Sequence, residues 1–308
     1  MTAIATRALT KIYKRPLGRP TAPSLDNLDL DVGENEVFGF LGRNGAGKTT
    51  TIKLLCSLLH PTRGEALILG KSVRTPEARR SVGYLPEDPY FYEYLTPKET
   101  LDFYGRLQGM SALDRKEEWE KLSVLLDLAG IAGQRVREFS KGMRQRLGFA
   151  VALVGDPAIL ILDEPMSGLD PLGRRAMREI ILELRCQRKT IFFSSHVLGD
   201  VEQICDRVGI LVKGRLTVQG RLDQLLTSNI EQVEVIASGL DPKAVAEIGA
   251  KAVSSRVSEA GDHFLVADLD TANEVVRMIH ARRARLVEFT PVKESLEDYF
   301  MRKQEPHS

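Results

Sequence analysis

The residues best suited to chemistry lie in one glycine-rich segment, Gly42-Arg43-Asn44-Gly45-Ala46-Gly47-Lys48-Thr49. This segment fits the phosphate-loop pattern G-x-x-x-x-G-K-[ST]. Its glycines allow backbone N–H groups to form an anion-binding nest, and the helix that follows directs its positive end at the same anion. Lys48 is expected to reach the β- and γ-phosphates of a nucleoside triphosphate, and the Thr49 hydroxyl to hold Mg²⁺.

Two adjacent acids follow an apolar run much further along the chain. The four apolar residues 159–162 predict a buried strand, and Asp163 and Glu164 come directly after it. Ligands of open α/β sheets gather at the carboxyl ends of the strands. We therefore expect Asp163 to orient Mg²⁺ through its water shell, and Glu164 to polarise the water that attacks the γ-phosphate.

A third segment, Ser140-Lys141-Gly142-Met143, begins an amphipathic helix between these two. Ser140 is a natural N-cap, and the free N–H groups of a helix start attract anions. The helix can complete a γ-phosphate site only from another chain, because the phosphate loop of its own chain already lies under a different helix. The three segments together predict an ATPase in which two copies of the chain associate head to tail around two ATP molecules.

With these motifs in this order, residues 1–226 resemble the ATP-binding subunit of an ABC transporter. The phosphate loop with Thr50 stands at the Walker A position of that family, and residues 159–164 stand at the Walker B strand. The segment from Ser140 stands at the signature motif, and Ser167-Gly168-Leu169-Asp170 stands at the D-loop. The resemblance implies a P-loop α/β fold, ATP and Mg²⁺ as cofactors, and hydrolysis coupled to transport.

The resemblance also assigns roles to single residues. Tyr13 stands where the family stacks a ring on adenine, Glu87 where most members have the Q-loop glutamine, and His196 at the switch histidine. The implied catalytic residues are Glu164 and His196, and the implied magnesium residues are Thr49, Asp163 and Glu87. The implied nucleotide contacts are Tyr13, Gly42, Asn44, Gly45, Ala46, Gly47, Lys48, Thr49, Thr50, Ser140, Gly142 and Asp170.

Three positions depart from the family pattern. Lys141 and Met143 replace the first glycine and the glutamine of the usual signature, and Glu87 adds negative charge near the γ-phosphate. These variants, with a last helix that contains Ser295–Phe300, resemble the exporter-type branch, whose membrane subunits are separate chains. We therefore expect export, with a multi-spanning membrane subunit as a second partner.

The apolar pattern predicts two domains with a boundary near residue 226. Residues 1–226 predict the ATP-binding domain, with a helical subdomain at about 88–155 and a capping box at Thr96 and Glu99. Residues 227–308 predict a small α+β domain of ferredoxin-like order, β-α-β-β-α-β. There we expect a second capping box, Thr271 with Glu274, and a last helix at 294–301.

Composition excludes several classes of protein. A formal net charge of +1 over 308 residues gives no reason to expect nucleic acid as a partner. No apolar run approaches the roughly 18 residues that a membrane span needs, and residues 1–7 do not read as a signal peptide. Cys56, Cys186 and Cys205 are too scattered for a metal or redox pair. We expect a cytoplasmic protein, held at the inner face of the membrane through its membrane subunit.

Two alternative functions and one surface remain open at this stage. An ABC ATPase that acts on ribosomes or DNA usually carries tandem ATPase domains or a long coiled-coil insertion, and this chain has neither. A purely regulatory nucleotide-binding module would lack a base, whereas Glu164 is present. The aromatic run Pro89–Tyr94 fits either contact with the membrane subunit or packing on the helical region.

Overall fold

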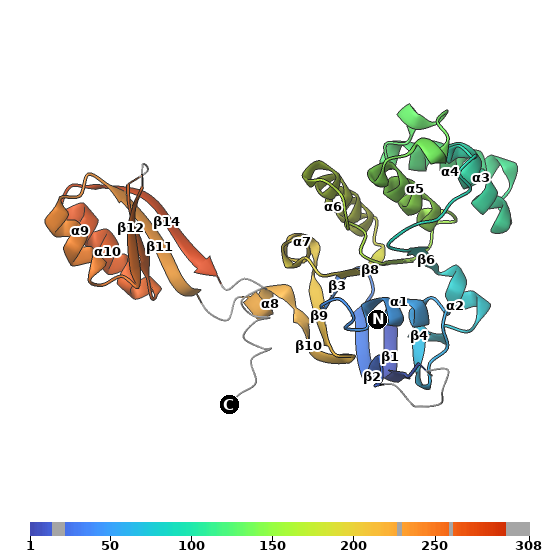
Figure 1. Cartoon of the computed structure of the whole chain (residues 1–308), viewed down its shortest axis with the longest axis horizontal. Helices are drawn as coiled ribbons and strands as arrows, with labels where there is room; N and C mark the ends of the chain where they lie inside the picture. The colour runs from blue at the N-terminus through green and yellow to red at the C-terminus, as the bar shows by residue number, and fades with distance from the viewer. Residues whose placement is uncertain (14–21, 227–229, 259–260, 294–308) are drawn as a thin grey trace. The chain divides into compact units, whose positions relative to one another are not determined.

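The computed structural model of the chain describes residues 1–13, 22–226, 230–258 and 261–293. The chain divides into two compact units, Met1–Leu222 and Asp223–Ser308 (Figure 1). This division lies four residues before the boundary expected near residue 226. The expected helix at 294–301, with Ser295–Phe300, lies outside the described residues. None of the helices in the described ranges has the length and apolar character needed to cross a membrane.

The central sheet of the first unit has the strand order β10-β9-β3-β8-β7-β6. Neighbouring strands are parallel except β9 and β10, which form an antiparallel hairpin around Lys213 and Gly214. Because β3, β8 and β7 are adjacent and parallel, the segments that follow them meet at one edge of the sheet. The strands are β3 (Val37–Leu41), β6 (Val82–Leu85), β7 (Ile159–Leu162), β8 (Thr190–Ser195), β9 (Arg207–Val212) and β10 (Arg215–Arg221).

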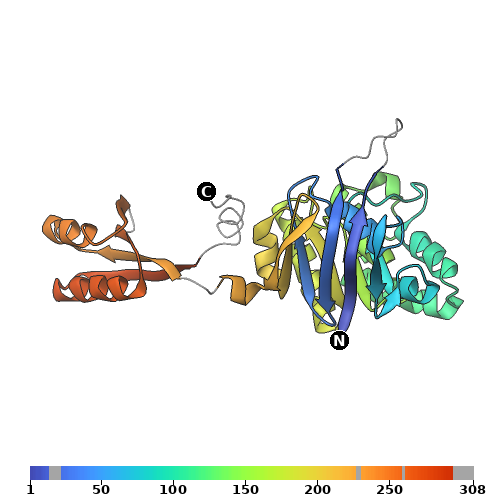
Figure 2. The ribbon, with the colours of Figure 1, turned by 90° about the horizontal axis from the view of Figure 1, so that it is seen from below.

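An antiparallel sheet with the strand order β2-β1-β4-β5 lies beside the central one (Figure 2). One buried core joins Ile4 and Leu28 of this sheet, Ile52 of α1 (Lys48–Leu55) and Phe192 of the central sheet. Strands β1 and β2 were not predicted. Residues 28–32 of β2 do alternate apolar and acidic residues, which is a strand signal, whereas the apolar residues of β1 do not alternate. The strands are β1 (Thr2–Lys11), β2 (Leu25–Gly33), β4 (Arg63–Ile68) and β5 (Lys71–Ser72).

The helices α3, α4 and α5 form a separate group in Figure 1. The capping box at Thr96 is confirmed: its hydroxyl accepts from the Glu99 N–H, and Glu99 accepts from the Thr96 N–H. Gly109, with φ 78°, separates α3 from α4. The remaining helices of this unit are α2 (Pro76–Arg80), α3 (Pro97–Leu107), α4 (Ala112–Leu125), α5 (Lys141–Leu153), α6 (Pro171–Cys186) and α7 (Leu198–Ile204), with 3₁₀ turns at Ala129–Ile131 and Val136–Glu138.

The second unit has the element order β-α-β-β-α-β after a short helix, α8 (Leu222–Leu226). Its sheet order is β12-β13-β11-β14, with every neighbouring pair antiparallel. Helices α9 and α10 share a core with β11 and β13, which includes Val235, Phe264 and Val275. The elements are β11 (Ile230–Ser238), α9 (Pro242–Gly249), β12 (Ser254–Ser258), β13 (Gly261–Val266), α10 (Leu269–Ala281) and β14 (Arg285–Lys293).

The capping box expected at Thr271 and Glu274 is wrong. The N-cap of helix α10 is Asp268, three residues before Thr271, and it accepts from the Thr271 N–H at 2.7 Å. Glu274 instead pairs with Lys251 at 2.6 Å. Aspartate is at least as favourable as threonine at an N-cap, so the sequence offered two starts to the same helix.

Because each unit has its own apolar core, we expect a core truncation to destabilise one unit alone. Phe264→Ala should lower the stability of the second unit by about 3–5 kcal/mol, the usual cost of a buried phenylalanine, and Phe192→Ala should do the same in the first unit. Hydrogen exchange followed by mass spectrometry reads both units in one sample. Loss of protection in both units from either substitution would show one cooperative fold.

Candidate functional site

The phosphate loop joins β3 to α1 at the edge of the central sheet where β7 and β8 also end. Gly47 precedes α1 with φ 113°, and a Cβ there would lie 2.6 Å from the Ser24 carbonyl oxygen, so only glycine fits. The loop borders a pocket of about 410 Å³. The residues that line it are Ser24, Asn44, Gly45, Gly47, Lys48, Thr49, Thr50, Glu87, Glu164, Ser167 and His196.

Lys48 is a buried cation held by two oxygens. Its side chain is 6% exposed, and Nζ donates to the Gly42 carbonyl at 2.7 Å and pairs with Glu164 Oε1 at 3.2 Å. The Glu164 side chain is also buried, at 9% exposed. Removing either partner from such a pair leaves an uncompensated buried charge, which is strongly unfavourable. Lys48 therefore presents a positive charge that any anion entering the pocket can share.

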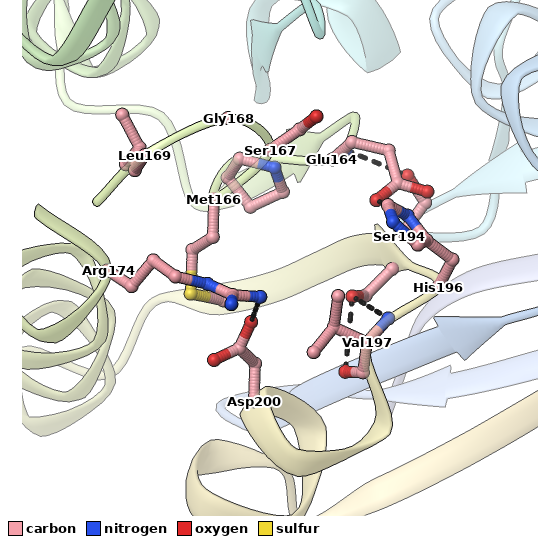
Figure 3. A pocket seen from close by; sticks show the side chains of 12 residues that line it. Glu164, Met166, Ser167, Gly168, Leu169, Arg174, Ser194, His196, Val197 and Asp200 are labelled. Carbon is pink, nitrogen blue, oxygen red and sulfur yellow. Dashed lines mark hydrogen bonds and ion pairs between the residues drawn. The ribbon is translucent and has the colours of Figure 1, made fainter. Parts of the chain in front are cut away.

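Glu164 is held on three sides in a left-handed backbone conformation, with φ 48°. Besides Lys48, its Oε2 lies 2.8 Å from His196 Nδ1, and its backbone N–H donates to Ser194 Oγ at 2.9 Å. Figure 3 shows the Glu164, Ser194 and His196 side chains converging at one end of a pocket. A carboxylate fixed in this way has a defined direction, which a group that orients a water needs.

Asp163, the residue before Glu164, is buried, at 2% exposed. Its Oδ1 accepts from Ser194 Oγ at 2.7 Å and from Thr49 Oγ1 at 3.4 Å. Burial raises the pKa of Asp163, and the hydrogen bonds from Ser194 and Thr49 act against that rise. The structure thus places Asp163 next to Thr49, as the shared magnesium role predicted.

Ser194 is a site residue that the sequence prediction missed. Its hydroxyl donates to Asp163 and accepts from the Glu164 N–H, so it joins the end of β8 to both acids after β7. The only sequence signal was a hydroxyl residue near the end of an apolar strand. That signal has meaning only once β7 and β8 are known to be neighbours.

The remaining residues predicted to contact the nucleotide or the magnesium ion lie in the phosphate loop or close to it. Tyr13 OH lies 3.4 Å from Thr50 Oγ1, with the Lys11 ammonium 5.4 Å from its ring centroid. Ala46, within the loop, is buried, and Glu87 lines the same pocket as Lys48 and Thr49. The half-exposed Tyr13 ring is thus at the rim of the loop, where a base could stack on it.

Ser140, Gly142 and Asp170 lie at a second pocket, of about 510 Å³. Ser140 caps α5, accepting from the Met143 N–H at 3.3 Å, and Asp170 caps α6, accepting from the Gly173 N–H at 2.8 Å. The lining of this pocket is Ser140, Lys141, Gly142, Arg146, Gly168, Leu169, Asp170, Leu172, Gly173, Ala176 and Met177. It shares no residue with the pocket of the phosphate loop. A single chain therefore does not bring these three residues to its own phosphate loop.

Comparison with known proteins shows which proteins this chain is similar to in sequence and in structure. Residues 25–167 match the family described as ABC transporter. An uncharacterized ABC transporter ATP-binding protein of Synechocystis sp. is 40% identical over 97% of this chain and 84% of its own length. The Nod factor export ATP-binding protein I of Cupriavidus metallidurans is 37% identical over 71% of this chain and 73% of its own. A solved ATP binding subunit of an ABC transporter superposes with a TM-score of 0.65, at 32% identity over 72% of this chain and 91% of that one.

Because the pKa of Asp163 is raised, we expect its ionised carboxylate to lower the stability of the fold at neutral pH. A folded-state pKa above the unfolded value means that the ionised carboxylate destabilises the fold, so Asp163→Asn should raise the melting temperature at pH 7 without nucleotide. The difference should shrink as pH falls through that pKa, because Asp163 itself then becomes neutral. Calorimetry of both proteins across pH 4–8 tests this.

Asp156→Asn is the matched control with the opposite sign. A hydrogen bond from Lys189 lowers the pKa of Asp156, so its charge stabilises the fold at neutral pH. Its replacement should lower the melting temperature at pH 7, and the loss should fade as pH falls through the unfolded value toward the lowered one. Two shifts of the same sign at pH 7 would contradict this account of Asp163.

Proposed function

The chain belongs to the family of ATP-binding proteins of ABC transporters, and we propose that two copies of it hydrolyse ATP at shared sites to drive a separate membrane subunit. The observation that carries this proposal is the convergence of Lys48, Glu164 and His196 from the ends of three adjacent strands. A cation for the phosphates, a carboxylate for the water and a histidine beside it are what γ-phosphate cleavage requires.

The Lys48–Glu164 pair suggests how nucleotide prepares the site. Phosphate oxygens that enter the pocket compete with Glu164 for the Lys48 ammonium. Glu164 then keeps His196 as its side-chain partner, 2.8 Å away, and its carboxylate can accept a proton from water. In this proposal the buried pair holds the base inactive until the substrate is present.

The residues present fit a magnesium ion bound together with the nucleotide. Among the described residues no group of three or more His, Cys, Asp and Glu could hold a metal ion by itself. Mg²⁺ usually keeps several waters and binds through one or two carboxylates plus substrate phosphates. Thr49 and Asp163 would hold the ion, and Glu87 lines the same pocket. When bound, the ion would neutralise the charge that develops on the phosphates.

The separation of the two pockets supports a site shared between chains. The phosphate-loop pocket contains Lys48 and Glu164, and the second pocket contains the N-terminus of the 13-residue helix α5. A helix start with free N–H groups and Ser140 as N-cap suits the γ-phosphate of ATP bound to another copy. Two copies in head-to-tail orientation would complete two such sites at once.

An exposed aromatic surface supports a membrane subunit as the driven partner. In the run after Glu87, Phe91 is buried, whereas Tyr90, Tyr92 and Tyr94 are 84%, 50% and 60% exposed. The buried ring supports packing of the run on its own chain, and the three exposed tyrosines leave aromatic surface available for a partner. Exposed aromatic residues are enriched at interfaces. Export is the direction named for the Cupriavidus relative, and an ATPase so coupled would lie at the cytoplasmic face of the membrane.

The first test concerns the base. Glu164→Gln should bind ATP yet lose about 10²- to 10⁴-fold in turnover, the usual contribution of a positioned base. Because Gln is neutral, Lys48 also loses its buried counterion, so ATP should bind at least as tightly as in the wild type. Lys48→Ala is the control that should lose affinity. Near wild-type turnover by Glu164→Gln would exclude Glu164 as the base.

A second test concerns the shared site. Among the described residues a Cβ on Gly142 would meet only Leu169, at an ordinary 3.7 Å, so Gly142→Asp should fold as a single chain. Its carboxylate would oppose the phosphate of a partner's ATP, and we expect ATP binding without dimerisation or hydrolysis. Mixing it with Lys48→Ala chains creates dimers with one intact site, and activity should return.

The mixing result separates two arrangements of the site. If the mixture stays inactive although mixed dimers are detected, and Gly142→Asp alone still dimerises with ATP, both halves of the site belong to one chain. Gly142→Ala is the steric control, which adds a methyl group without charge and should keep more activity than Gly142→Asp.

A further inference from the structure

Asp200 is a buried carboxylate that links two helices behind the site. It lies in the first turn of α7 and is 5% exposed at its side chain. Its Oδ2 accepts from Arg174 Nη2 at 2.7 Å, and its Oδ1 from Arg178 Nη1 at 2.9 Å. Arg174 and Arg178 are four residues apart, on one face of α6. Figure 3 shows the Arg174–Asp200 contact across the pocket from Glu164 and His196.

The linked helices continue the two loops that carry the reacting groups. Residues 163–170 lead from β7 to α6 and include Glu164, while residues 196–197 lead from β8 to α7 and include His196. At the strand ends the loops are joined by Ser194 and by the Glu164–His196 contact. At the helix ends they are joined by Asp200. The pocket of about 210 Å³ between them is lined by both loops.

Three features make the Asp200 contact able to fix this geometry. A buried carboxylate with two charge-assisted partners is costly to separate from them. Arg174 Nε is buried with no hydrogen-bond partner among the described residues, so Asp200 is the group that holds that guanidinium. His196 is 46% exposed at its side chain, so little packing holds its ring in place.

We propose that Asp200 is a positioning residue for hydrolysis, which holds α7 against α6 so that His196 stays within hydrogen-bond reach of Glu164. This inference rests on the proposed function. Without nucleotide, Glu164 has both Lys48 and His196 as partners. Once phosphates take Lys48, the direction of the carboxylate depends on His196, and therefore on where α7 lies. Asp200 should matter for turnover and not for ATP binding.

The experiment compares Asp200→Asn with Asp200→Glu in steady-state ATP hydrolysis by the full chain. Asp200→Asn should lower kcat by roughly 10- to 100-fold, the scale of a small misplacement of catalytic groups, with the KM for ATP changed less than about 3-fold. Asp200→Glu should recover part of the loss, because it keeps the charge. Melting temperatures of all variants are measured in parallel.

Arg178→Gln and Arg185→Gln are a matched pair on the same helix. Arg178 contacts Asp200, whereas Arg185 pairs with Asp206 at the other end of α6. Arg178→Gln should lower kcat and Arg185→Gln should leave it unchanged. Arg178→Gln keeps the Arg174–Asp200 contact, so it also carries the test if Asp200→Asn does not fold.

A His196→Gln background shows whether Asp200 acts through His196. If it does, Arg178→Gln should add little to the loss caused by His196→Gln, whereas independent effects would multiply. Multiplicative losses, or an unchanged kcat in both Asp200→Asn and Arg178→Gln, would overturn the inference. A wild-type chain that does not hydrolyse ATP, even in dimers, would instead overturn the proposed function.

Discussion

The site depends on one electrostatic constraint, the buried ammonium of Lys48. A cation that is 6% exposed needs an anion, and in this structure Glu164 supplies it at 3.2 Å. The same residue is the proposed base. Glu164 cannot pair with Lys48 and act as the base at the same time. Under the proposed function, the triphosphate would resolve this conflict because it brings other anionic partners for Lys48. In the proposed mechanism, this constraint links substrate binding to the release of the base.

The central sheet makes this constraint possible. Its order places β8 between β3 and β7, so the phosphate loop, the two acids and His196 follow three adjacent parallel strands. Ser194, at the end of the middle strand, bonds to Asp163 and to the Glu164 N–H, and so fixes the acids relative to one another. The Asp200 contact would hold the same loops at their far ends. Hydrogen bonds and ion pairs thus join the two loops that contain Glu164 and His196 at both of their ends.

Local sequence predicted those parts of the fold and of the site that local chemistry determines. The glycine pattern at 42–49, the apolar run 159–162 and the Thr96 cap each act within a few residues, and each lies where expected. The roles of Ser194 and Asp200 depend on which strands and helices are neighbours, which no local pattern reveals. The Thr271 cap failed for the opposite reason, since Asp268 offered an equally good local start. Strand β1 was missed because its apolar residues do not alternate and its burial depends on its neighbours β2 and β4, whereas the alternation at residues 28–32 of β2 was a local signal that the prediction did not use.

The central claim is that hydrolysis needs two copies of the chain, because each provides only half of a site. The most direct measurement is the ATPase rate per chain as the wild-type concentration is lowered through the range in which dimers dissociate, with the oligomeric state measured in the same samples by mass photometry. The account predicts that the rate per chain falls in proportion to the dimer fraction. A constant rate per chain in samples that contain only single chains would contradict it.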